Sequence, residues 1–156
     1  MMSPATVLVC GDRHRRDDAA ALCAADRLGE VIPDDVVVRR VGQLGADDLV
    51  AASSTGRCVV IDAVRGIAPG TVVSMPLVDL QSRGPASASS HALPLPTVIA
   101  LADALGADME LATFVGIGGE EFELGEGLSP RVEEALDAFV AAIAQSLFSQ
   151  DGVPCA

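Results

Sequence analysis

The sequence predicts an α/β protein, a three-layer α/β/α sandwich around a mostly parallel, roughly five-stranded twisted sheet. Short apolar segments alternate with amphipathic ones along its 156 residues, as in chains whose strands and helices alternate. The strand candidates are apolar at nearly every position, which is typical of parallel strands covered on both faces. The length fits a single domain over residues 1–156, and with 50% hydrophobic residues the chain has enough apolar surface to build a core.

The first half of the chain supplies four of the predicted strands. "TVLVC" at 6–10 is followed by a helix at 17–29, with Asp17 as its expected N-cap and Gly29 as its stop. Further strands are expected at 35–41, 57–64 and 70–77, and "GADDLVAASS" predicts a short helix at 45–54. The order of these segments favours a doubly wound sheet.

The second half begins with a stretch rich in Ser, Ala and Pro at 78–96, which predicts a loop. A helix at 97–106 and a fifth strand at 110–117 follow, and then a polar, glycine-rich loop at 118–127. Ser129 is a suitable N-cap and Pro130 a suitable first residue for the last helix, which repeats apolar residues at helical spacing.

The charge of the chain excludes several functions. Its net charge is -12, and all 10 basic residues are Arg, so phosphate backbones are repelled and nucleic-acid binding is not expected. No apolar run is long enough to span a bilayer, and the N-terminus lacks the features of a signal peptide, so we expect a cytoplasmic protein with no membrane partner. The 4 cysteines lack zinc-type spacing and are expected to be reduced thiols, with Cys10 and Cys58 in the core.

Common catalytic motifs are missing. There is no GxGxxG after the first strand, no Walker motif in a chain without Lys, and no GxSxG elbow. The densest basic cluster is "RHRR" at 13–16. Such a cluster is most often a solvated patch, but these arginines can also pair with Asp12, Asp17, Asp35 or a substrate carboxylate.

Three polar groups are expected near the carboxyl ends of the strands, where ligands bind in open α/β sheets. The pair Asp17 and Asp18 follows the first strand, Asp62 ends the apolar run "CVVID", and His91 precedes a helix. Two carboxylates and an imidazole suit a first-row metal ion with open positions. They equally suit an acid/base hydrolase without a metal, and the spacing does not decide between the two.

Four motifs in order resemble those of the [NiFe]-hydrogenase maturation endopeptidases, the M52-like peptidases. They are "VLVCGDRHRRDD", "VVIDAVRGIAPGTV", "SSHALPLPTVIALADALG" and "FVGIGGEEFELGEGLSPRVEEALDAFV", which together span nearly the whole chain. The resemblance implies a protease that removes the C-terminal extension of the hydrogenase large subunit precursor during its maturation. It also implies Asp18, Asp62 and His91 as the catalytic metal ligands, while Asp17 caps the helix.

The resemblance further implies that the metal is nickel already loaded in the precursor, with cadmium or zinc as substitutes in crystals. Two features depart from the family pattern. Arg40 stands where the family carries an Asp after its second strand, and "RHRR" replaces mostly apolar residues. These departures leave open a non-catalytic assembly or nickel-binding factor on the same fold, and a third alternative is a different α/β hydrolase or nucleotide binder.

Overall fold

The computed structural model describes residues 4–80 and 93–148. The predicted elements are all present, with ends shifted by a few residues. The strands are β1 (Ala5–Cys10), β2 (Val36–Gly42), β3 (Arg57–Val64), β4 (Val72–Pro76) and β5 (Ala112–Gly118). The helices are α1 (Ala20–Leu28), α2 (Ala46–Ser53), α4 (Leu95–Ala104) and α5 (Pro130–Phe148), with short 3-10 turns η1 (Arg16–Ala19) and η2 (Leu77–Asp79).

The sheet has the order β2-β1-β3-β5-β4. β1 pairs in parallel with β2 and β3, and β3 pairs in parallel with β5. Among the strands of residues 4–80 and 93–148, only β4 runs antiparallel, beside β5, which confirms a mostly parallel five-stranded sheet. Because β1 and β3 are parallel neighbours, the residues that follow them emerge at the same edge of the sheet.

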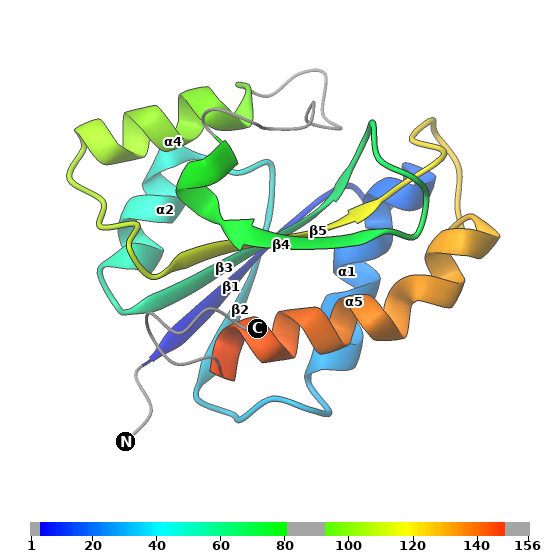
Figure 1. Cartoon of the computed structure of the whole chain (residues 1–156), viewed down its shortest axis with the longest axis horizontal. Coiled ribbons are helices and arrows are strands. Elements are labelled where there is room, and N and C mark those ends of the chain that lie inside the picture. The colour runs from blue at the N-terminus through cyan, green and yellow to red at the C-terminus, as the bar shows by residue number, and fades with distance from the viewer. Residues whose placement is uncertain (1–3, 81–92, 149–156) are drawn as a thin grey trace.

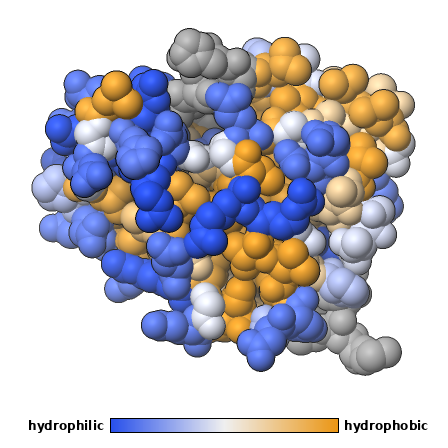
Figure 2. Space-filling view, turned by 180° about the vertical axis from the view of Figure 1, so that it is seen from behind, coloured by the Kyte–Doolittle hydropathy of each residue, from blue (hydrophilic) through white to orange (hydrophobic). Residues whose placement is uncertain are grey.

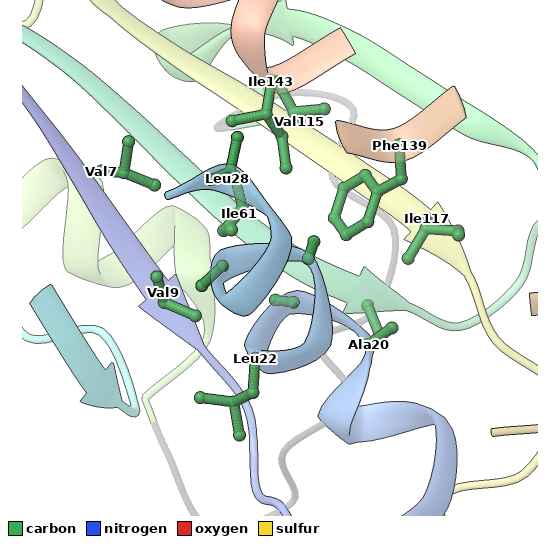
Figure 3. Packing of buried hydrophobic residues seen from close by; sticks show 14 of the residues in the cluster. Val7, Val9, Ala20, Leu22, Leu28, Ile61, Val115, Ile117, Phe139 and Ile143 are labelled. Atoms are coloured by element: carbon green, nitrogen blue, oxygen red, sulfur yellow. The ribbon is translucent and has the colours of Figure 1, made fainter. Parts of the chain in front are cut away.

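Helices cover both faces of the sheet, with α1 and α5 on one side and α2 and α4 on the other (Figure 1). The three central strands therefore supply two cores. Alternate residues such as Val7 and Val9 pack under α1 and α5, whereas Leu8 and Cys10 pack under α2 and α4. Figure 3 shows the first core, where Phe139 and Ile143 of α5 meet the strands.

Helix α4 begins at Leu95, two residues before the predicted start at 97. Pro96 therefore lies in the first turn of the helix, where its missing N–H removes no intrahelical hydrogen bond. None of the described helices is long and apolar enough to cross a membrane.

Strand β2 forms an edge of the sheet, with β1 as its neighbour. Val37 is half exposed on it, and ion pairs flank it: Arg39 with Asp48 and Arg40 with Asp26. Charged side chains on an edge strand oppose pairing with other chains. Figure 2 shows the molecule from behind, where hydrophilic residues run in a band between hydrophobic patches.

Candidate active site

The turn after β1 is closed by hydrogen bonds among residues 12–18. Gly11 has a φ of 121°, and a Cβ there would overlap the carbonyl oxygen of Asp18. The backbone N–H of Asp12 donates to Oδ2 of Asp18 (2.9 Å), and that of His14 donates to Oδ1 of Asp12 (2.8 Å). Only a glycine tolerates this conformation and this close approach, so Gly11 allows Asp18 to fold back onto the end of β1.

Asp17 is fully buried and lies next to the loop after β5, not at the start of its own helix. Its carboxylate accepts hydrogen bonds from the N–H groups of Glu120 (2.8 Å), Glu121 (3.0 Å) and Ser129 (2.7 Å) and from the Ser129 hydroxyl (2.7 Å). Burial by itself raises the pKa of Asp17, but these hydrogen bonds outweigh it and lower that pKa below its usual value.

The expected capping role of Asp17 is therefore wrong, since neither η1 nor α1 has a side-chain cap. A 3-10 turn precedes α1 and turns the Asp17 side chain away from the helix start. Its partners lie more than 100 residues further along the chain, in the loop before α5, which runs beside the start of α1 (Figure 1). Asp17 thus anchors this loop beside the turn that carries Asp18.

Asp62 lies near the end of β3, directly opposite Gly116 of β5. Its Oδ1 accepts a hydrogen bond from the N–H of Ala63 (2.8 Å). Burial, and after it the negative charge of Asp18, raise the pKa of Asp62 to about 8. The metal-free protein therefore holds a proton on Asp62 at neutral pH.

Asp18 and Asp62 are close enough for the negative charge of Asp18 to act on Asp62, and both were expected at this edge of the sheet. Asp18 is buried, and burial raises its pKa; the N–H of Asp12 and the charges of Arg15 and Arg65 oppose this rise. The Cys10 thiol lies in the same region, since its pKa is raised by burial and then by Asp62 and Asp18. A protonated thiol therefore accompanies the two carboxylates, and Cys10 and Cys58 are both buried as predicted.

A divalent cation fits the chemistry of this pair. Two partly desolvated carboxylates repel each other, and a cation between them would neutralise both. Within residues 4–80 and 93–148, no group of three or more His, Cys, Asp or Glu side chains is arranged to hold a metal ion. The third predicted ligand, His91, lies outside the described residues, so the ligand set of Asp18, Asp62 and His91 stays a prediction.

The basic cluster after β1 divides into side chains with different surroundings. Arg16, which has a φ of 47°, lies against the backbone of Gly125 and pairs with Glu121 (3.2 Å). Arg15 lies 3.7 Å from Asp12, with 44% of its side chain exposed. Arg13 and His14 are exposed, which agrees with the solvated patch that the composition favours.

A further arginine reaches the site from the other strand. Arg65 follows β3 and holds its guanidinium carbon 4.4 Å from the centre of the Phe122 ring, while its charge opposes the rise that burial causes in the pKa of Asp18. The sequence motifs did not single out Arg65 or Phe122. The only available signal was the position of Arg65, three residues after Asp62 in the same strand-end segment.

Arg40 takes part in an exposed ion pair. Arg40 lies in β2, and a nitrogen of its guanidinium is 2.6 Å from Oδ1 of Asp26 on α1. In the register of the sheet it is opposite Val9, one residue before Cys10. A cation therefore stands on β2 close to the end of β1, and it is balanced by an acid of the neighbouring helix.

These features define an α/β protein with a carboxylate pair where two parallel strands end. The family model described as "HycI: Hydrogenase maturation protease" matches residues 27–146. The chain therefore belongs to the hydrogenase maturation protease family, which confirms the resemblance of its motifs. A comparison with curated protein sequences found no match.

Solved structures agree over nearly the whole chain. The hydrogenase maturating endopeptidase HybD from E. coli superposes with a TM-score of 0.76 at 24% identity, covering 94% of this chain and 92% of its own. The maturation protease HybD from Thermococcus kodakarensis superposes with a TM-score of 0.67 at 26% identity, covering 96% and 100%. HycI from the same organism gives 0.70 at 21%, covering 94% of each chain. At these identities the likeness shows the fold.

Proposed function

We propose that this protein is a metal-dependent endopeptidase that removes the C-terminal extension from a nickel-loaded [NiFe]-hydrogenase large subunit precursor. The observation that carries the proposal is the proximity of two acids at one edge of the sheet: Asp62 near the end of β3 is acted on by the negative charge of Asp18, which is buried in the segment after β1. Membership of the maturation protease family supports this reaction over other hydrolase chemistry.

In this proposal the nickel arrives with the substrate. Asp18 and Asp62 supply oxygen ligands and His91 a nitrogen ligand, a donor set that suits Ni(II) and leaves positions for the precursor. A divalent ion held there supplies Lewis acidity toward an amide carbonyl or a water molecule. Asp62, whose pKa is about 8, gives up its proton when the cation binds, so binding couples to proton release near neutral pH.

The test is cleavage of the nickel-loaded precursor, followed by mass spectrometry of the large subunit. The expected result is loss of the C-terminal extension with wild-type protein and no loss with Asp18→Asn, Asp62→Asn or His91→Ala. Asp34→Asn is the matched control, since Asp34 is exposed in the loop before β2, and it should cut normally. An intact extension after incubation with folded wild-type protein, when an active maturation protease cuts the same sample, contradicts the proposal.

A second candidate is a non-catalytic assembly or nickel-binding factor on the same fold. The reason to consider it is that arginines stand here where the family pattern has other residues. Arg40 pairs with Asp26, and Arg15 and Arg16 lie in and just after the turn that follows β1. This alternative predicts a stable complex with the large subunit and no cleavage. Co-purification of the uncut precursor with the wild-type protein separates it from the protease, and absence of association rules it out.

A further inference from the structure

The loop between β5 and α5, residues 119–129, exposes a leucine to solvent. Leu124 is 71% exposed, the largest fraction among the exposed large apolar residues of 4–80 and 93–148. Isolated apolar residues are common at protein surfaces and by themselves need no explanation. The surroundings of Leu124 therefore decide whether it has a role.

The backbone is fixed on both sides of Leu124. Two residues before it, Phe122 is buried and packs in the core formed with α1 and α5. Directly after it, the N–H of Gly125 donates to the carbonyl oxygen of His14 (2.9 Å), and the carbonyl oxygen of Gly125 accepts from the N–H of Arg16 (3.2 Å). Leu124 thus lies between a buried ring and a backbone bridge, which hold it at a defined position.

The beginning of the same loop is tied to the segment after β1. The N–H of Asp17 donates to the carbonyl oxygen of Glu121 (2.9 Å), and its carboxylate accepts from the N–H groups of Glu120 and Glu121. Arg16 pairs with the Glu121 side chain (3.2 Å). A loop held by these bonds keeps little conformational freedom, so little is lost when it binds a partner.

Backbone contacts place Leu124 beside the candidate active site. Gly125 forms a bridge with Arg15, and the carbonyl oxygen of Arg15 accepts from the N–H of Asp18 (3.0 Å). Because β5 is parallel to β3, the loop also starts at the edge of the sheet where β1 and β3 end (Figure 1). A protein that brings its C-terminal segment to Asp18 therefore lies within reach of this loop.

The charges around Leu124 bear on the kind of partner. Glu123 and Glu126 are exposed next to it, and the whole chain has a net charge of -12. A second copy of this chain would bring further negative charge to the loop, and repulsion opposes that contact. A partner with an apolar side chain flanked by Arg or Lys fits both the leucine and the two acids.

We propose that Leu124 is a docking residue, which packs against an apolar side chain of the precursor protein while the C-terminal segment of that protein occupies the candidate active site. The inference rests on the proposed function, because it concerns recognition of that same substrate. Burial of an exposed leucine in the complex removes apolar surface from water and stabilises the complex. Leu124 contacts the substrate away from the reacting atoms, so it sets affinity.

Binding is measured by biolayer interferometry on the immobilised nickel-loaded precursor. The parent protein carries Asp62→Asn, which the proposed function expects to leave the precursor uncut. Adding Leu124→Ser should weaken the Kd about tenfold, as for loss of one buried leucine side chain, whereas Leu124→Met should stay within about twofold. Leu105→Ser is the matched control, because Leu105 is 60% exposed at the end of α4, and it should bind like the parent.

Urea unfolding midpoints check that the variants are folded, and they should equal that of the parent because both leucines are exposed. Equal affinity of the parent and the Leu124→Ser variant overturns the docking role, and so does an equal loss with Leu105→Ser. In the cleavage assay with otherwise wild-type protein, Leu124→Ser should raise KM more than it lowers kcat.

The outcomes separate this inference from the proposed function. Binding that depends on Leu124, without cleavage by the wild type, keeps the docking role and contradicts only the protease activity. Cleavage with the same KM in the wild type and the Leu124→Ser variant keeps the protease and rejects the docking role. No association of the parent or the wild type with the precursor contradicts both.

Discussion

At the scale of single residues, Asp62 is an acid near the end of an apolar strand, and the negative charge of Asp18 is nearby. The Asp62 pKa of about 8 means that the folded protein keeps this proton, whereas the unfolded chain releases it near the ordinary aspartate pKa of 3.8. The folded state therefore binds more protons between these values, and its free energy of unfolding falls as the pH rises through this window.

Asp62→Asn is expected to stabilise the metal-free protein, and increasingly so toward alkaline pH. The amide oxygen still accepts the hydrogen bond from Ala63 N–H, but no charge develops beside Asp18. We expect the free energy of unfolding to rise by about 1 to 3 kcal/mol near pH 9 and to change little near pH 4. The rise is smaller than the full pKa shift implies, because the Asp62 side chain is partly exposed. Urea unfolding in a chelating buffer across this pH range measures it, and parallel profiles for the two proteins contradict it.

Asp17 shows the opposite behaviour, because its charge is satisfied by hydrogen bonds. Asp17→Ala leaves the N–H groups of Glu120, Glu121 and Ser129 without their acceptor, and a loss of about 3 kcal/mol or more is expected at neutral pH. Since folding lowers the pKa of Asp17, its contribution is present above about pH 4 and is lost as the pH falls through the lower folded pKa.

Urea unfolding at neutral and acidic pH tests this contribution, with Asp34→Ala as the control for an exposed acid. The control should change the free energy of unfolding by less than about 0.5 kcal/mol. If Asp17→Ala and Asp34→Ala have the same unfolding midpoint, the anchoring role of Asp17 is wrong.

At the scale of elements, β1, the turn after it and η1 together position Asp17 and Asp18. Gly11→Ala is expected to destabilise the protein by at least about 2 kcal/mol, because its φ is 121° and its Cβ would overlap the backbone of Asp18. Gly29 ends α1 with a φ of -55° and has open space around it, so Gly29→Ala should change stability by less than about 1 kcal/mol. Denaturant midpoints of the two variants compare them, and equal midpoints contradict the role of Gly11.

At the scale of the whole molecule, the two cores share the central strands. Val7 and Leu8 are neighbours in β1 but pack on opposite faces of the sheet. Loss of packing on one face therefore weakens the strands that the other face also needs, and we expect the two helical layers to unfold together.

Leu136→Ala on α5 and Leu49→Ala on α2 test this coupling, since each leucine belongs to a different core. Each should cost about 2 to 5 kcal/mol. Each should also lower hydrogen-exchange protection in the helices of both faces. Leu101→Ala on α4 is the matched control, because this leucine is 45% exposed and the change should cost less than about 1 kcal/mol. Protection lost only on the substituted face contradicts a single cooperative unit.

The pattern of apolar and polar residues along the chain was enough to predict the helices and strands, and the strand ends where the candidate site lies. Continuous apolar runs identify β1 and β3, because a strand covered on both faces buries successive residues of the chain. The alternation of such runs with helices identifies the parallel sheet. The positions of Asp18 and Asp62 follow from them, since parallel strands end at one edge. The motifs also predicted the family.

Contacts between side chains that are distant in the chain became visible in the folded structure alone. Asp17 was expected to cap its own helix, but its partners Glu121 and Ser129 lie more than 100 residues away in sequence. The raised pKa of Asp62 depends on burial and on Asp18, and the site of Arg65 depends on Phe122. Local patterns carry no information about such distant neighbours, because hydrogen bonds and electric fields act through space, and packing of the helices on the sheet brings these groups together.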